Sequence, residues 1–187
     1  PALFGSKRPL QLIVEGDGSW TRWRGTAAMT TSGRPTLRLA LAADEGRYRL
    51  GGKLAPAPFL KGKLQRLTTP VIDVRGQGTL ADRQLDGELR LASPSLRAVA
   101  RGRVDLAEGA YRQLRLGVDL LKPTALFKNM TGRNVRLVWT LDGPFGGADY
   151  SYRLTSPGVK FDNTGFVDVR AEGRGRGTPW PMRVPLR

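Results

Sequence analysis

Three clusters of acidic side chains are the first candidates for chemistry in this sequence. They are Asp44 and Glu45, then Asp82, Asp86 and Glu88, then Asp105 and Glu108. Two carboxyl groups can act as general acid and base, as in glycoside hydrolases, only if a cleft brings them together and raises one pKa. Here most acidic residues lie at turn signals or alternate with apolar residues, so they are expected to face water. We therefore predict solvated carboxylates and no catalytic residues.

Two missing residue types remove most other enzyme chemistry. The 187 residues include no His and no Cys. Without His there is no Ser-His or Cys-His activation of a nucleophile and no imidazole metal ligand. Without Cys there is no thiolate zinc site, iron–sulfur cluster or disulfide. The sequence therefore predicts a protein that is not an enzyme and has no metal site and no cofactor.

A glycine-rich stretch could in principle cradle phosphate. No Gly-x-x-x-x-Gly-Lys-Ser/Thr pattern occurs, however, and the run Gly173-Arg174-Gly175-Arg176-Gly177 does not lie between a strand and a helix. The geometry that holds phosphate on backbone N–H groups is therefore not predicted. We interpret this run as a flexible loop in preference to an RNA-binding tract.

The excess of basic residues is the strongest compositional signal. Lys and Arg number 31 against 16 Asp and Glu, which gives a net charge of +15. Such a charge can attract nucleic acid through its phosphates or an anionic membrane surface. The arginines are spread along many segments, and no helix-turn-helix, zinc-finger or RNA-recognition motif occurs. We rank a solubilised sheet face first, membrane attraction second and nucleic acid last, and predict no nucleic-acid partner.

Apolar and polar residues alternate along most of the chain. Examples are the runs 37–41, 96–106, 114–120 and 135–141. Alternation with period two indicates strands that have one apolar and one wet face. Short Gly, Pro, Asp and Ser turns separate the runs, whereas parallel crossovers need a dozen or more residues. We predict an all-β fold with an antiparallel-rich sheet, in which residues 1–187 form a single section.

Two segments break this alternation. The residues near 123–131 are expected to form a short helix, with Pro123 in its first turn and Gly132 as its C-terminal cap. Residues 54–69 contain Pro56 and Pro58 and are expected to be a long connection or a hinge between two sheet units.

The apolar face of such a sheet needs a partner. It could pack on a second sheet, close into a barrel, or curl into a half-pipe that keeps an open apolar groove. A transmembrane barrel is disfavoured because aromatic residues are only 7% of the chain and form no girdles. A protein that keeps a large exposed apolar surface usually fills it with a ligand, so the half-pipe favours hydrocarbon chains as that ligand.

Several local strings then point to a family. They are Gly18–Gly25 (GSWTRWRG), Leu121–Phe127 (LKPTALF), Leu137–Phe145 (LVWTLDGPF) and Val167–Gly175 (VDVRAEGRG). Together they resemble the translocation and assembly module subunit (TamB) family, which is related to the AsmA-like group, and most of all its alphaproteobacterial members. The likeness runs over most of the chain.

The resemblance implies a fold, a location and a function. It implies a mid-chain section of a longer protein that is anchored in the inner membrane of a Gram-negative bacterium and crosses the periplasm as a curled β-groove (β-taco). It implies phospholipid transport toward the outer membrane and support of outer-membrane protein assembly with a TamA-like barrel partner, through parts of the parent not present here. Neighbouring β-groove segments of the same chain are expected to flank this one. A chaperone-like scaffold that engages outer-membrane protein strands remains the alternative.

Alternation and resemblance together select candidate residues. We expect the lipid-binding groove to be lined by Leu37, Leu39, Leu89, Leu91, Val104, Leu106, Leu114, Leu116, Val118, Leu137, Trp139 and Leu141. We expect Leu126, Phe127 and Met130 to plug or gate one end of it. Ordinary core packing is the alternative for each of these residues.

Overall fold

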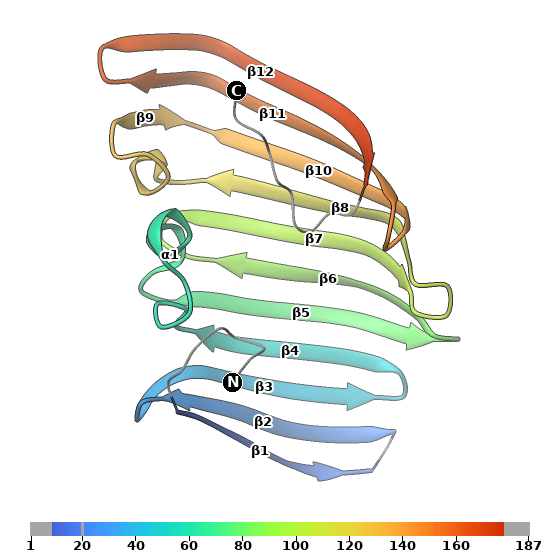
Figure 1. Cartoon of the computed structure of the whole chain (residues 1–187). Coiled ribbons are helices and arrows are strands. Elements are labelled where there is room, and N and C mark those ends of the chain that lie inside the picture. The colour runs from blue at the N-terminus through green and yellow to red at the C-terminus, as the bar shows by residue number, and fades with distance from the viewer. Residues whose placement is uncertain (1–8, 20, 178–187) are drawn as a thin grey trace.

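The protein, for which we use a computed structural model, is one open sheet of 12 strands (Figure 1). Residues 9–19 and 21–177 are described; Trp20, which belongs to one of the strings above, lies outside them. The first strands are β1 (Leu10–Gly18), β2 (Arg22–Thr31), β3 (Arg34–Asp44), β4 (Arg47–Leu54), β5 (Ile72–Ala81) and β6 (Gln84–Ala92). They are followed by β7 (Leu96–Asp105), β8 (Ala110–Leu120), β9 (Met130–Arg133), β10 (Val135–Pro144), β11 (Ala148–Phe161) and β12 (Thr164–Gly177).

Each strand pairs with its neighbours in the chain. The order runs from β1 to β8 and then β10, β11 and β12, and all pairs are antiparallel. The short β9 is the exception, since it pairs with the end of β11 and continues the line of β10. Asn134 between them has a φ of 53°, so β9 and β10 form one strand that is bent at that residue.

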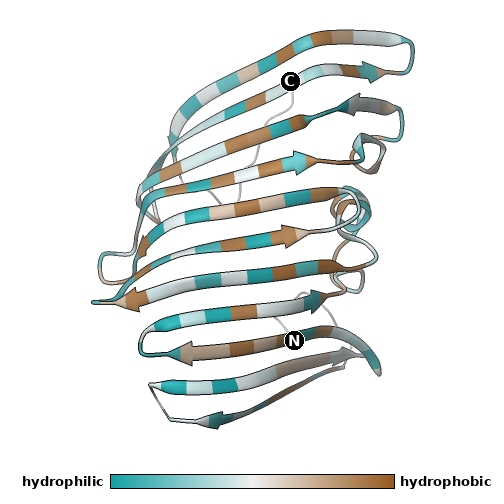
Figure 2. Cartoon of the chain, turned by 180° about the vertical axis from the view of Figure 1, so that it is seen from behind, coloured by the Kyte–Doolittle hydropathy of each residue, from teal (hydrophilic) through white to brown (hydrophobic). Residues whose placement is uncertain are grey.

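Strand alternation gives the sheet two different faces. Cross-strand partners share a face, and the register aligns Leu41, Leu50, Gly76, Leu89, Ala100, Leu116 and Trp139 in one row. The next row, on the other side, aligns Ala42, Arg49, Gln77, Glu88, Arg101 and Arg115. We call these sides the apolar face and the polar face. Figure 2 shows the alternation as brown and teal segments along the strands.

No second layer packs against the described sheet. The sheet is open and curled, which confirms the prediction of an all-β, antiparallel half-pipe. None of the described large side chains is fully buried, because one layer of strands cannot enclose them. One small cluster of Met130, Val135 and Val159 is buried near the β9–β11 pair.

The helix predicted near 123–131 begins at Pro123 as expected but is shorter than predicted. Only the 3₁₀ turn η2 (Pro123–Ala125) forms there, and the chain extends again as β9 from Met130. Met130 is 6% exposed in the cluster with Val135 and Val159, so its burial favours strand pairing over a continued helix. Gly132, expected as a helix cap, lies within β9.

The α-helix of the described chain lies instead in the segment that joins β4 to β5. This helix, α1 (Gly62–Thr68), begins at Gly62, which has a φ of 64°, and buries Leu67. Because Leu54 pairs with Ile72, residues 54–69 leave and rejoin one continuous sheet.

The glycine-rich run 173–177 is a strand rather than the predicted flexible loop. It forms the end of β12 and pairs with β11 from Gly173 opposite Tyr152 to Gly177 opposite Ala148.

Candidate apolar groove

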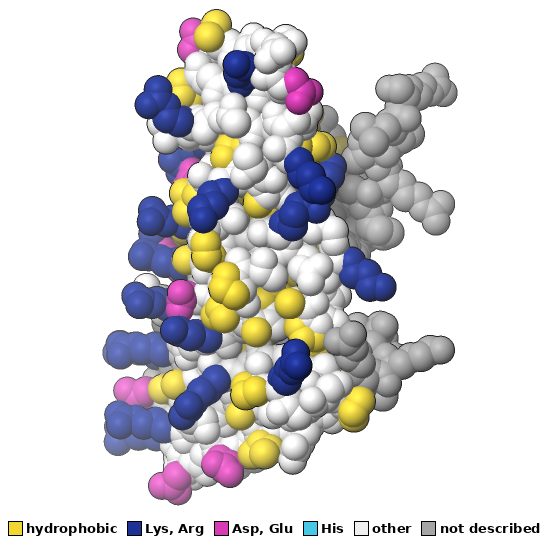
Figure 3. All heavy atoms as spheres, turned by 90° about the vertical axis from the view of Figure 1, so that its left-hand side faces the viewer, with side chains coloured by type: hydrophobic (Ala, Val, Ile, Leu, Met, Phe, Trp, Pro, Cys, Tyr) yellow, Lys and Arg dark blue, Asp and Glu magenta, His cyan; other side chains and the backbone are white. Residues whose placement is uncertain are grey.

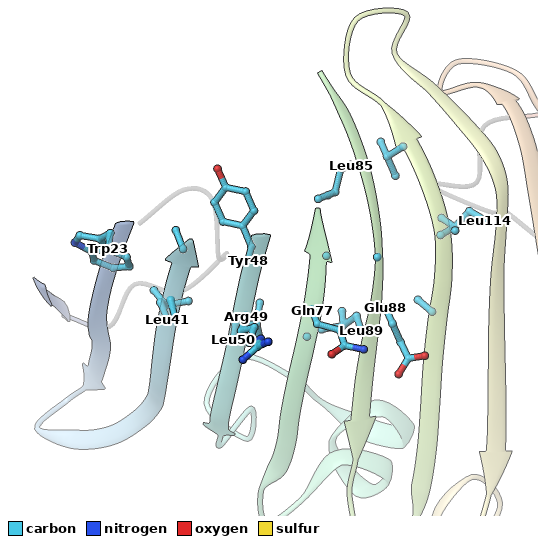
Figure 4. Close-up of a pocket in the computed structure, with 18 residues that line it drawn as sticks. Trp23, Leu41, Tyr48, Arg49, Leu50, Gln77, Leu85, Glu88, Leu89 and Leu114 are labelled. Atoms are coloured by element: carbon cyan, nitrogen blue, oxygen red, sulfur yellow. The ribbon is translucent and has the colours of Figure 1, made fainter. Parts of the chain in front are cut away.

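The apolar face is hollowed across β2 to β8. The hollow has a volume of about 530 Å³ (Figure 4). Its apolar side chains are Trp23, Leu41, Ala43, Tyr48, Leu50, Leu85, Leu89, Ala100, Val104 and Leu114. Arg49, Gln77 and Glu88 border it too, but strand alternation turns their side chains to the polar face. The hollow can therefore accept hydrocarbon and offers little for a polar ligand.

Missing side chains create the depth of this groove. Gly78, Gly87 and Gly102 are cross-strand partners on β5, β6 and β7, and Gly76 lies two residues from Gly78 on the same face. A Cβ atom on Gly87 would lie 2.7 Å from the carbonyl oxygen of Gln77, and one on Gly102 would lie 2.7 Å from the Cα of Leu114. Both contacts are with backbone, so side chains at these two positions would require the strands to shift.

Aromatic side chains cover the glycines toward both sheet edges. The Trp23 ring lies over Gly16 and Gly25, which flank it on β1 and on its own strand. On the other side, a Cβ atom on Gly173 would lie 2.7 Å from the Tyr152 ring. Large rings beside glycines keep the apolar face continuous where the strands carry no side chain of their own.

One end of the apolar face is covered. Ile72, Val74 and Ala98 on this face are at most 9% exposed, while their neighbours Asp73 and Arg97 on the polar face are exposed. Helix α1 lies over these strand ends (Figure 1). The Ser93 hydroxyl donates to the Leu67 carbonyl at 2.6 Å, which fixes the helix to the β6–β7 turn. The groove is thus capped at the α1 end of the strands and hollow toward the other.

Eleven of the twelve predicted lining residues lie on the apolar face, as the register shows. Leu89, Val104 and Leu114 border the hollow itself. Leu106 differs, because β7 ends at Asp105 and Leu106 lies in the following turn, 47% exposed.

The three predicted plug residues lie at the α1 end but not together in the groove. Met130 belongs to the buried cluster, and Leu126 packs against that cluster. Phe127 is 39% exposed, and the Lys63 ammonium lies 3.8 Å from its ring centroid.

Several residues of the hollow are not among the lining residues predicted from the sequence. Leu41 continues the alternation of Leu37 and Leu39, and Tyr48 and Leu50 alternate with Arg47 and Arg49, so their signal was present. The glycines gave no such signal, because glycine in a sequence usually marks a turn.

The polar face carries paired charges. Glu88 accepts hydrogen bonds from Arg90 on its own strand and from Arg101 on β7, and these bonds hold its pKa below the usual value near 4.5. Asp105 accepts the backbone N–H groups of Glu108 and Ala107, each at 3.0 Å, and these bonds lower its pKa despite its burial. Both acids are structural anchors, and neither has the raised pKa of a general acid.

Metal binding and membrane insertion are two other functions on which the described residues bear. Among residues 9–19 and 21–177 no group of three acidic residues is placed to hold a metal ion. The helices within the same ranges are too short and too polar to cross a membrane.

Comparison with known proteins adds no relative: no protein-family model, curated protein or solved structure matches the chain.

Proposed function

We propose that this chain is a non-enzymatic section of a lipid conduit, in which the apolar face carries the acyl chains of phospholipids. The observation that carries the proposal is the apolar face of a single-layer sheet, which the described residues leave open beyond the α1 end, with its hollow bordered by Trp23, Leu50 and Leu89. Burial of apolar surface is worth about 25 cal/mol per Å². An acyl chain laid across several strands would therefore gain on the order of several kcal/mol without any polar contact.

The family resemblance described above suggests the cellular location and the partners of this conduit. In that setting the chain lies in the periplasm of a Gram-negative bacterium, within a parent anchored in the inner membrane. It passes phospholipid toward the outer membrane and supports outer-membrane assembly with a TamA-like partner, with further β-groove segments on both sides. The open outer edges of β1 and β12, which no described strand occupies, are compatible with such segments.

A photo-crosslinking residue tests the lipid proposal in cells. Leu50 borders the hollow, and its neighbour Arg49 is turned to the polar face and is exposed. We expect phospholipid adducts with the photo-reactive residue at position 50 and few or none at position 49, measured by mass spectrometry of the purified protein. A folded protein with no lipid adduct at position 50, or with equal adducts at both positions, would contradict the proposal.

A second candidate function is a scaffold for unfolded outer-membrane protein strands. Strand β1 favours it, because Leu12 and Val14 are 61% and 57% exposed beside an unpaired strand edge. An extended segment could add to such an edge through backbone hydrogen bonds. Protein adducts at position 12, in place of lipid adducts at position 50, would favour this function.

A further inference from the structure

The lysines are distributed differently from the arginines. Six of the seven lysines lie in the described residues, at positions 53, 61, 63, 122, 128 and 160. All six are exposed and lie at or beyond the strand ends on the α1 side of the sheet. Arginines, in contrast, occur along the full length of the strands.

The two residue types also differ in their partners. Arginine supplies the cation in all ten ion pairs found within residues 9–19 and 21–177. None of the six described lysines lies within ion-pair distance of a carboxylate there. The lysine charges are therefore available to an external anion.

Four of these lysines lie on two elements that contact each other. Lys61 and Lys63 belong to the start of α1, whereas Lys122 and Lys128 flank η2. Arg66 of α1 donates to the carbonyl oxygens of Ala125 at 3.0 Å and Leu126 at 3.3 Å. The Lys63 ammonium over the Phe127 ring adds a second link.

Apolar side chains are exposed among these lysines. Leu64 is 56% exposed, Leu121 is 44% exposed and Phe127 is 39% exposed. We call the seven residues the lysine corner: Lys61, Lys63, Leu64, Leu121, Lys122, Phe127 and Lys128. Figure 3 looks onto this end of the sheet, where basic and apolar side chains are interspersed over the centre and the acidic ones visible lie mainly at the margins.

The turns at the two strand ends differ in charge. The described connections on the α1 side contain Lys61, Lys63, Arg66, Lys122 and Lys128 against the single acid Asp162. Asp162 already accepts a hydrogen bond of 2.7 Å from the Asn129 side chain. The described connections at the opposite end contain Glu45, Asp82 and Glu108 against Arg83. The connections on the α1 rim of the half-pipe therefore carry a net positive charge, and those on the opposite rim carry a net negative one.

We propose that the lysine corner is a contact site for the surface of an anionic phospholipid bilayer. Lysine ammonium groups would pair with headgroup phosphates while Leu64, Leu121 and Phe127 enter the interface, as on interfacial amphipathic elements. Exposed apolar side chains among unpaired lysines favour a bilayer over a soluble anion, which would use only the charges. This inference goes beyond the proposed function, because it concerns the exposed lysine corner at the α1 end of the sheet and does not depend on what fills the groove.

Vesicle binding tests the charge requirement. The whole chain would be sedimented with vesicles of phosphatidylcholine alone or of an equal mixture with phosphatidylglycerol. We expect binding to the mixed vesicles that weakens with salt. Each lysine near such a surface contributes roughly fivefold in affinity, so K61Q/K63Q/K122Q/K128Q should bind about 100-fold or more weakly.

A matched variant separates position from net charge. R47Q/R49Q/R115Q/R174Q removes the same charge from exposed arginines of the polar face that have no ion-pair partner and lie in the middle of the strands or toward the end opposite α1. We expect it to keep most of the binding. An equal loss in both variants, equal binding to neutral vesicles, or binding of free inorganic phosphate in place of vesicles would overturn the proposal.

A probe of insertion gives a second readout on the folded protein. The chain contains no Cys, so Leu64→Cys can be labelled at one site with an environment-sensitive dye. We expect a blue shift of its emission with mixed vesicles and none for the same dye at Arg75→Cys on the polar face. No shift at position 64 while the protein is bound would overturn the inserted geometry. Lipid adducts at position 50 are measured separately, so the two proposals can fail independently.

Discussion

At the scale of single residues, Glu88 links two arginines of the polar face. Its carboxylate accepts from Arg90 and Arg101, and Arg115 lies opposite Arg101 on the next strand. Like charges directly opposite each other destabilise a sheet. The carboxylate offsets that repulsion, which explains why one acid lies in the middle of an arginine-rich row.

Replacement of Glu88 tests this role. We expect Glu88→Gln to lower the melting temperature at neutral pH, because Arg90 and Arg101 lose their shared anion. The folded-state pKa of Glu88 is lowered, so its stabilisation is complete above the unfolded value near 4.5 and is lost as pH falls through the folded value. The difference between wild type and variant should therefore vanish at strongly acidic pH in thermal unfolding followed by circular dichroism.

An exposed pair provides the control for Glu88. Glu172 lies 3.4 Å from Arg153, and both side chains are more than 70% exposed. Exposed pairs of this kind contribute little to stability, so Glu172→Gln should leave the melting temperature nearly unchanged. A similar loss in both variants would assign the Glu88 effect to net charge alone.

Residue-level prediction from the sequence succeeded where alternation was regular. It placed Leu37, Leu91 and Leu137 on one face because side-chain direction follows from position within a strand. It could not find the hollow, which depends on Gly78, Gly87 and Gly102 being adjacent across three strands. That adjacency is set by register, and register follows from turn lengths that the sequence gives only approximately.

At the scale of elements, α1 shows how a short helix is held by its contacts. Seven residues are too few for a helix to be stable alone. Leu67 is buried at 8% exposure, and the Leu67 carbonyl accepts from Ser93. No clear helical pattern is visible in this segment of the sequence, because Pro56, Pro58 and Gly62 interrupt it and only four residues separate Gly62 from Leu67.

Truncation of two leucines on α1 should have unequal effects. Leu67→Ala removes a buried side chain and is expected to reduce the free energy of unfolding by about 2 kcal/mol, the low end for core leucines. Leu64→Ala, at 56% exposure, should change it by less than about 0.5 kcal/mol. Urea unfolding of both variants measures the difference. Equal effects would mean that α1 is not held on the sheet by Leu67.

At the scale of the whole molecule, the open sheet has two unequal edges. Strand β1 presents Leu12, Ile13 and Val14, all at least 44% exposed, whereas the central and final part of β12 carries Arg170, Glu172, Arg174 and Arg176. Apolar edge strands invite pairing with other chains, and charged ones resist it. The overall architecture was predictable, because alternation and short turns specify an antiparallel sheet. The capping of one end by α1 was not, because it depends on tertiary contacts.

Charges placed on β1 should reduce self-association. We expect L12K/V14K to lower the fraction of dimers and larger species in sedimentation velocity over a range of concentrations. L85K/L89K is the matched control, because both leucines are 38% exposed on the same face but belong to the interior strand β6. An equal decrease in both variants would show that the apolar face, rather than the β1 edge, drives association.

The pairing of each strand with its neighbours in the chain affects how the molecule can fold. Apart from β9, every strand of the described sheet pairs with the strand that precedes it along this path, so its pairing does not require a segment that is distant in the sequence. Hairpins can therefore form one after another as the polypeptide emerges from a ribosome or a translocation pore. The loop-closure entropy stays small at most steps, and the connection 55–71 between β4 and β5 is the longest loop to be closed. Additional hairpins could lengthen such a ribbon without altering the assembly of those already formed.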